Sequence, residues 1–232
     1  MSKFVRRVLL VRHGESVWNQ ESKFTGWTNI PLTANGRREA KQIGLTLASE
    51  QLYPNIIFSS VLQRAIDTSS IISNSIIGNF PTIHTSWRLN EKHYGTLEGV
   101  PRAHIRDVYG EKFTHMMRKN FNMKPPILRD NPPKYEYPIY RNCYFEKIKN
   151  GESKENVLDR LLPYFENDIM YTVSEGQLPL IVTHKHTARV LMKHLLRMSD
   201  EDFEYYDIPD KSIIELQFDN ASQYTGNRVI PI

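Results

Sequence analysis

The sequence has one cysteine, Cys143, among 232 residues, so no disulfide can form within the chain. This usage fits a reducing compartment such as the cytosol, and no reactive context marks Cys143 as a nucleophile. No apolar run approaches the length of a membrane span. Residues 1–4 lead directly into an expected strand and leave no room for a signal peptide. We therefore expect a cytoplasmic protein with no membrane partner.

Internal repeats and low-complexity linkers are also absent, which argues against a repeat architecture. With 40% hydrophobic and 24% charged residues, the chain has an ordinary globular composition and enough length for a substantial core. We expect a single domain over residues 1–232. Proline pairs at 125–126 and 132–133 interrupt regular structure between residues 101 and 150, and such long excursions in compact domains often carry function.

The net charge of +4 is unevenly distributed, because the stretch from Lys92 to Asn150 holds 12 Lys and Arg against 6 Asp and Glu. A basic excess can indicate nucleic-acid binding. Here the basic residues are scattered among Pro, Tyr and Asn without a helical stripe or a known motif, so we expect no nucleic-acid partner. An electropositive cover over a small anion explains the charge, and so does a solvated surface.

Apolar strands that alternate with amphipathic helices predict an α/β fold with a doubly wound, mostly parallel sheet. The expected strands are Val8–Val11, Ile56–Ser60, Pro81–Ser86, Leu180–Val182 and Ile214–Phe218, the last being the final strand of the chain. The expected helices start after Thr33, around Val61, at Ala103, at Lys112, at Ser153 and after His184. The helix from Ser153 is expected to carry apolar residues on one face as far as Ile169. The segment from Trp18 to Trp27 is polar and aromatic, so we expect a loop there.

Two expected strands end in histidine, at His13 and at His184, and the strand at residues 56–60 is followed by a helix that carries Arg64. The carboxyl ends of strands in a doubly wound sheet lie along one edge, where ligands bind. A neutral imidazole there could attack phosphorus, while Arg12 and Arg64 neutralise the phosphoryl oxygens. His13 could equally do no more than cap a strand.

A zinc site is the competing interpretation of the histidines, with His184 and His186 as ligands. No Cys or Asp spacing supports it, and neighbouring arginines would repel a cation, so we predict no metal. Glu91 is a candidate general acid or base, because the aromatic stretch from Trp87 to Gly95 could raise the pKa of its carboxyl group. Glu91 could instead pair with Arg88 or Lys92 in a structural role.

The stretch LVRHGESVWN at residues 10–19 resembles the signature of the histidine phosphatase superfamily. More narrowly, it resembles that of the 2,3-bisphosphoglycerate-dependent phosphoglycerate mutases. The narrower resemblance depends on FTGW at 24–27, on residues 59–68, on WRLNEKHYG at 87–95, and on residues 160–164 and 193–195. It implies one α/β domain with an inserted helical cover over residues 101–150. Relatives of this kind are often dimers, so a homodimer is a further expectation.

By this resemblance, His13 would be the phosphorylated nucleophile, charged by 2,3-bisphosphoglycerate, and phosphate would move between the 2- and 3-positions of glycerate. Arg12, Arg64 and His184 would hold the phosphoryl group. Glu91 would carry the proton of the substrate hydroxyl, and no metal would be needed. The other residues expected to bind the small phosphorylated substrate are Gly14, Glu15, Ser16, Val17, Trp18, Asn19, Thr25, Gly26, Lys92, His93, Tyr94, Arg102, Arg118, Lys119, Lys185 and His186.

The chain departs from the family pattern after the strand at 180–182. Lys185 stands where the family has a glycine, and a lysine would be strained by about 1 kcal/mol if that position needs a positive φ. His186 replaces a small amide, and Lys119 replaces an arginine.

Asp210 and Lys211 occupy a turn that usually reads Thr-Gly, and the sequence stops at Ile232 without a lysine-rich tail. Two alternatives to a mutase therefore stay open: a phosphatase that uses the same phosphohistidine, and a non-catalytic relative that binds a metabolite or a partner.

Overall fold

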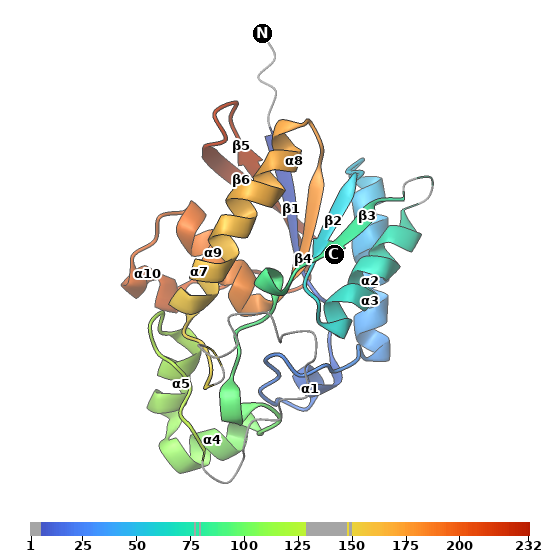
Figure 1. Cartoon of the computed structure of the whole chain (residues 1–232). Helices are drawn as coiled ribbons and strands as arrows, with labels where there is room; N and C mark the ends of the chain where they lie inside the picture. The colour runs from blue at the N-terminus through green and yellow to red at the C-terminus, as the bar shows by residue number, and fades with distance from the viewer. Residues whose placement is uncertain (1–5, 77, 79, 129–147, 149) are drawn as a thin grey trace.

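In a computed structural model of the chain, six strands form one sheet in the order β3-β2-β4-β1-β5-β6 (Figure 1). The structure describes residues 6–76, 78, 80–128, 148 and 150–232. The strands are β1 (Arg6–Arg12), β2 (Ile56–Ser59), β3 (Thr82–Thr85), β4 (Pro179–Thr183), β5 (Ser212–Phe218) and β6 (Tyr224–Pro231). The first four are mutually parallel, whereas β5 and β6 run antiparallel to their neighbours. The predicted α/β fold with a mostly parallel sheet is confirmed.

The central strand β1 is buried on both faces because helices cover the sheet on both sides (Figure 1). Its alternate residues point to opposite faces. Val8 and Leu10 pack into a core that includes apolar residues of α7 (Lys154–Tyr164) and α9 (Lys185–Leu195). Leu9 and Val11 pack into a second core with apolar residues of α2 (Ala34–Ser49) and α3 (Gln63–Ser75). The continuous apolar run of β1 is thus explained by these two cores.

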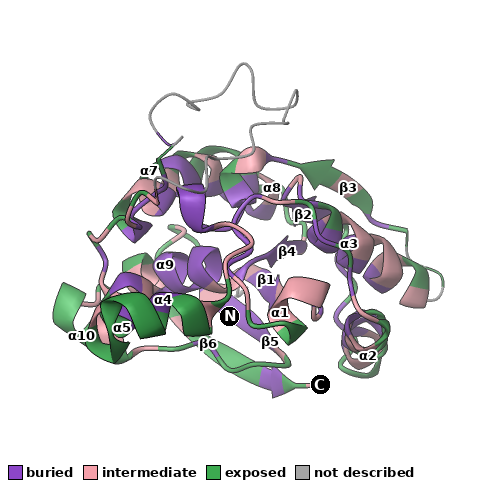
Figure 2. Cartoon of the chain, turned by 90° about the horizontal axis from the view of Figure 1, so that it is seen from below, coloured by how far each residue is buried: buried purple, intermediate pink, exposed green. Residues whose placement is uncertain are grey.

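The remaining helices are short, and several of them lie around the carboxyl edge of the sheet (Figure 1). They are α1 (Val17–Gln20), α4 (Arg102–Tyr109), α5 (Glu111–Lys119), α8 (Met170–Ser174) and α10 (Asp200–Tyr205), with 3-10 turns η1 (Trp87–Leu89) and η2 (Gly95–Leu97) and a π-helical segment η4 (Phe165–Ile169). Helices α4 and α5 lie below the sheet (Figure 1), and residues 129–147 and 149 of the expected cover lie outside the described residues. Seen from below, α4 is largely exposed and α9 is largely buried (Figure 2).

Several local predictions need correction. The expected loop after Trp18 holds the short helix α1, which Ser16 caps through its side chain. The helix from Ser153 does not continue regularly to Ile169, because Pro163 lies inside it and a π-helical segment follows. The strand at 212–218 is not the last one, since β6 pairs with it, and α10 was not predicted. Cys143 and the prolines at 132–133 lie outside the described residues.

No helix in the described part of the chain is long and apolar enough to span a membrane.

Lys211 adopts a φ of 52°, a left-handed conformation that favours glycine. We expect Lys211→Gly to raise the free energy of unfolding by about 0.5–1 kcal/mol, because the strain removed exceeds the entropy that glycine gains in the unfolded chain. Urea denaturation measures this change. Lys41→Gly, on the exposed side of α2, is the control and should destabilise by about 1 kcal/mol. A loss of stability in Lys211→Gly would show that the turn is not strained.

Candidate active site

A cavity lies where the carboxyl ends of β1 and β4 meet the cover. It is lined by Arg12, His13, Asn19, Phe24, Thr25, Gly26, Arg64, Glu91, Tyr94, Arg102, Arg118, Lys185 and His186. These residues come from the end of β1, the α1 segment, α3, the 87–95 stretch, the cover helices and the start of α9. The structure therefore brings together most of the side chains that the sequence pattern singled out.

His13 is held in one tautomer by its own backbone neighbourhood. Its Nδ1 lies 2.6 Å from the carbonyl oxygen of Gly14, and a carbonyl can only accept, so Nδ1 carries the hydrogen. Burial lowers the pKa of His13 well below its usual range, and the charges of Arg64 and Arg12 lower it further. The imidazole is therefore neutral near pH 7, and Nε2 keeps a lone pair for nucleophilic attack.

Arg64 is fixed beside this lone pair. Its two terminal nitrogens donate to the carbonyl oxygens of Thr28 (2.9 Å) and Gly26 (2.7 Å), and its Nε donates to the lone pair of His13 Nε2 over 3.3 Å. Only 1% of the residue is exposed. A buried guanidinium held this rigidly is suited to neutralise charge that develops on a group bound to Nε2.

His184 faces His13 from the end of β4, with the two ring centroids 4.8 Å apart. Ser60 Oγ accepts from the backbone N–H of Leu62, and it lies 2.7 Å from His184 Nε2. If its hydroxyl donates to Nε2, the hydrogen of the neutral ring is on Nδ1. Burial and the nearby Arg64 lower the pKa of His184 well below its usual range. His184 can therefore donate from Nδ1 without carrying a charge.

Glu91 supplies the one carboxylate among the described residues that line the cavity. Burial raises the pKa of its carboxyl group above the ordinary 4.5, although the backbone N–H groups of Lys92 and His186 and the charge of Arg64 oppose the rise. Lys92 N donates to Glu91 Oε1 over 2.8 Å. A buried carboxyl with a raised pKa in a site of this kind can both give and take a proton.

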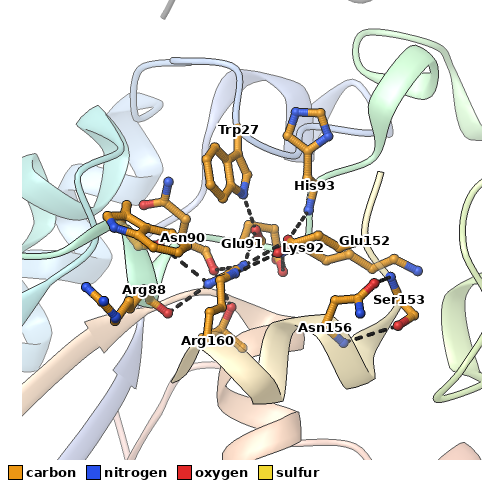
Figure 3. Close-up of polar contacts among 12 residues, drawn as sticks. Trp27, Arg88, Asn90, Glu91, Lys92, His93, Glu152, Ser153, Asn156 and Arg160 are labelled. Carbon is orange, nitrogen blue, oxygen red and sulfur yellow. Dashed lines mark hydrogen bonds and ion pairs between the residues drawn. The ribbon is translucent and has the colours of Figure 1, made fainter. Parts of the chain in front are cut away.

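The backbone around Glu91 is clamped from both sides (Figure 3). Arg160 of α7 donates to the carbonyl oxygens of Arg88, Asn90 and Glu91. Trp27 Nε1 donates to the Glu91 carbonyl oxygen over 2.6 Å. Sequence reasoning did not assign Arg160 or Trp27 to the site, because their contacts with the segment that carries Glu91 are with its backbone and leave no side-chain motif.

Arg160 is itself held by Glu152 in a fully buried ion pair with an Nε–Oε1 distance of 2.7 Å. We expect Arg160→Leu to lower the free energy of unfolding by about 3 kcal/mol, because it leaves Glu152 charged and buried without its partner. Chemical denaturation checks this value. Arg228→Leu removes a half-exposed arginine from Glu215, which keeps Arg7 as a second partner, so it should cost much less. Equal losses in the two variants would contradict the buried clamp.

The cover contributes a cationic wall. Arg102 and Arg118 come from α4 and α5, and both lower the pKa of Tyr94 although burial raises it overall. Tyr94 Oη lies 2.8 Å from His186 Nε2. Arg12, Arg64, Arg102, Arg118 and Lys185 thus place five cations around one carboxylate in the described part of the cavity.

Five buried polar side-chain atoms of the described residues have no hydrogen-bond partner: Arg12 Nε, Thr25 Oγ1, Arg102 Nε, His184 Nδ1 and His186 Nδ1. Four of these residues line the cavity, and His184 touches its nucleophile. Buried polar atoms are normally paired, so this cluster indicates a place for a ligand. Most of the atoms are donors next to cations, which indicates an anion.

Several predicted binding residues lie outside this cavity. Lys92 is fully buried, and its ammonium group donates to the carbonyl oxygens of Met117 and Met123 on the cover. His93 accepts from Gly95 N, and Lys119 pairs with Asp207.

The residues after His13 shape the backbone. Gly14 packs so closely on α2 that a Cβ would lie 2.2 Å from Gly36 O. The Glu15 carboxylate accepts a hydrogen bond from the Thr33 hydroxyl. Ser16 caps α1, and Val17 and Trp18 are the first two residues of that helix. Gly14 and Glu15 also line an adjoining cavity of about 300 Å³.

Lys185 is the first residue of α9, and its φ is not positive. The strain considered for a lysine at this position is therefore absent. Its Nζ lies 3.0 Å from Asp207 Oδ2 while the residue also lines the cavity.

Ser60, the partner of His184, was missed in the sequence. It follows directly after β2, so the rule that placed His13 and His184 at the sheet edge also applied to it. No group of three or more His, Cys, Asp or Glu in the described ranges could hold a metal ion.

The family model of the histidine phosphatase superfamily (branch 1) matches residues 8–226. The chain belongs to this superfamily. It is 34% identical to a 2,3-bisphosphoglycerate-dependent phosphoglycerate mutase of Corynebacterium efficiens, over 88% of this chain and 81% of the relative. It is 33% identical to such a mutase (numbered 2) of Bacteroides thetaiotaomicron, over 93% of this chain and 88% of that protein.

Among solved structures, the fold is similar to that of a mycobacterial glucosyl-3-phosphoglycerate phosphatase in complex with VO3. The TM-score is 0.73 at 22% identity, over 97% of this chain and 98% of that chain. A Bacillus stearothermophilus protein, YhfR, also has a TM-score of 0.73, at 24% identity over 94% of both chains. Superfamily members transfer phosphoryl groups, and the cavity of this chain has the groups for that reaction.

Proposed function

We propose that the protein is a 2,3-bisphosphoglycerate-dependent phosphoglycerate mutase, which interconverts 3-phosphoglycerate and 2-phosphoglycerate through a phosphohistidine at His13. The observation that carries the proposal is the pairing of a neutral, tautomer-fixed nucleophile with cover arginines in one cavity. A phosphatase needs only to hold a phosphoryl group. A mutase must also keep a glycerate carboxylate and a second phosphate in place, and Arg102 and Arg118 supply charge for these.

In the first half of the reaction, His13 Nε2 attacks the phosphorus of a bound phosphoester. The P–N bond forms, the P–O bond breaks, and the leaving oxygen takes a proton from the Glu91 carboxyl group. Arg12, Arg64 and His184 stabilise the charge on the phosphoryl oxygens. In the second half, the Glu91 carboxylate removes the proton of an acceptor hydroxyl, whose oxygen then attacks phosphorus and breaks the P–N bond.

The residues present fit a bisphosphorylated primer. The unpartnered donors Arg12 Nε, His184 Nδ1 and Arg102 Nε lie on or beside the cavity, and Arg118 adds charge on the cover side. Such a primer would supply the phosphoryl group that charges His13. Arg12, Arg64 and His184 would hold the phosphate at the nucleophile, while Arg102 and Arg118 would hold the anionic groups farther from it.

The test is conversion of 3-phosphoglycerate to 2-phosphoglycerate by the purified chain, with and without 2,3-bisphosphoglycerate, while free phosphate is measured in parallel. Isomerisation that depends on the bisphosphate, with little phosphate release, supports the mutase. Phosphate release without isomerisation supports the second candidate, a phosphatase, which the similarity to solved phosphatase structures favours. Absence of both reactions would contradict catalysis.

A further inference from the structure

Three cations outside or at the rim of the cavity converge on one carboxylate. Asp207, in the segment between α10 and β5, lies 3.0 Å from Lys185 Nζ, 3.4 Å from Lys119 Nζ and 3.8 Å from Arg189 Nε. These cations lower the pKa of Asp207 although burial opposes them, so it is charged at neutral pH. The Asp207 carboxylate thus lies between the cover helix α5 and the start of α9 and pairs with a lysine of each.

A second carboxylate of the same segment acts on the cavity. Asp210 Oδ1 lies 3.0 Å from Arg12 Nη1, and its Oδ2 lies 4.0 Å from Lys185 Nζ. Arg12 and Lys185 both line the cavity. Two of the five cations in its described lining are therefore partly neutralised by the chain itself, through the acidic segment, which we define as residues 207–210.

We propose that Asp207, supported by Asp210, sets the charge specificity of the cavity by lowering its affinity for ligands with more than one phosphate. Asp207 draws the ammonium group of Lys185, which lines the cavity, to itself, so this group contributes less to a second anionic group of a ligand. Among the arginines at the nucleophile, Arg64 is held by the backbone carbonyl oxygens of Thr28 and Gly26, whereas Arg12 pairs with Asp210. Asp207 itself pairs with neither of these two arginines in the contacts given above, so the first phosphate keeps Arg64, whereas a second phosphate competes with Asp207 for Lys185.

The inference rests on the proposed function only in that the cavity takes organic phosphates. Asp207 does not reach the reacting atoms, so it is a specificity-determining residue that acts through Lys185. Both ion pairs with Asp207 are partly solvated, with side chains 24–41% exposed, so their strength depends on salt.

The experiment compares two ligands with the same carbon chain and no transferable phosphoryl group, propylphosphonate and propane-1,3-diphosphonate. Calorimetry gives the ratio of their dissociation constants for each variant. We expect Asp207→Asn to tighten diphosphonate binding by about ten-fold and monophosphonate binding by about two-fold, because the released charges act mainly on the second group. Asp210→Asn mainly frees Arg12, which faces the phosphonate that both ligands carry, so it should tighten binding of both ligands and change their ratio by a smaller factor than Asp207→Asn.

Two variants serve as controls. Asp200→Asn removes the same charge from an aspartate that pairs with Lys193 over 2.9 Å, away from the cavity, and should leave the ratio unchanged. Asp207→Glu keeps the charge and should restore the wild-type ratio, which a purely structural role of Asp207 would not require. High salt should reduce the difference between wild type and Asp207→Asn.

An unchanged ratio in Asp207→Asn, or an equal change in Asp200→Asn, would overturn the inference. Its failure can be told apart from failure of the proposed function, because the phosphonates report binding alone. If the wild-type chain fails to isomerise phosphoglycerate but Asp207→Asn shows the shifted ratio, the mutase is contradicted and the role of Asp207 is supported. If the wild-type chain isomerises phosphoglycerate but the ratio in Asp207→Asn is unshifted, the mutase is supported and the role of Asp207 is contradicted.

Discussion

Replacing His13 with alanine should reduce phosphoryl transfer by at least about four orders of magnitude, because the reaction loses its nucleophile. The environment of the ring supports this size of effect. Its Nδ1 hydrogen is committed to the Gly14 carbonyl, and burial together with Arg64 and Arg12 keeps the ring neutral.

The measurement is twofold: steady-state turnover of 3-phosphoglycerate, and transfer of labelled phosphate from 2,3-bisphosphoglycerate to the protein. His13→Ala should show neither. His194→Ala, an exposed histidine of α9 outside the cavity, is the matched control and should retain both. Labelled phosphate on the His13→Ala chain would mean that the nucleophile is another residue.

The sequence predicted the parts of the fold that burial alone determines. The strands at 8–11 and 180–182 and residues 56–58 of the second strand are apolar throughout because each is covered on both faces, so their pattern does not depend on distant partners. The edge strand β6 was missed because it alternates exposed charged and polar residues with few buried ones. Its pairing with β5 is a tertiary contact that local pattern does not reveal.

The candidate site divides in a similar way. Residues at the carboxyl ends of strands, such as His13 and His184, follow from topology. Lys92 illustrates the limit, since it is adjacent to Glu91 in the sequence but its side chain runs to the cover and ends on backbone carbonyls. Asp207 is a further case, because the three cations that meet it come from two helices far from it in the chain. Such convergence depends on how the cover docks.

The pH dependence of stability offers a check on Glu91. Its folded-state pKa lies above the ordinary 4.5, so the folded chain binds the proton more tightly than the unfolded chain does. Stability from this group is full below pH 4.5 and is lost as pH rises through the folded-state pKa. Glu91→Gln should therefore be at least as stable as wild type at pH 7, and its stability should fall less as pH rises above 4.5.

The effect of the same substitution on catalysis should be large and opposite in sign. Glu91→Gln cannot give or take the proton of the substrate oxygen, so we expect transfer to slow by about 10²–10⁴-fold. Phosphorylation of His13 needs the protonated carboxyl group, so its rate in wild type should fall as pH rises through the raised pKa. Rapid-quench measurement of the phosphohistidine as a function of pH gives this profile.

In Glu91→Gln this pH dependence should disappear, because no other carboxylate lines the described part of the cavity. Glu201→Gln, on the exposed start of α10, should keep the wild-type rate and profile. A slow variant with a preserved pH profile would indicate that Glu91 only positions the clamped segment. An unchanged rate would indicate that Glu91 has only a structural role, as a partner in an ion pair. A slow variant that has lost the profile identifies Glu91 as the proton carrier, since a structural role would not remove one titration and leave the fold intact.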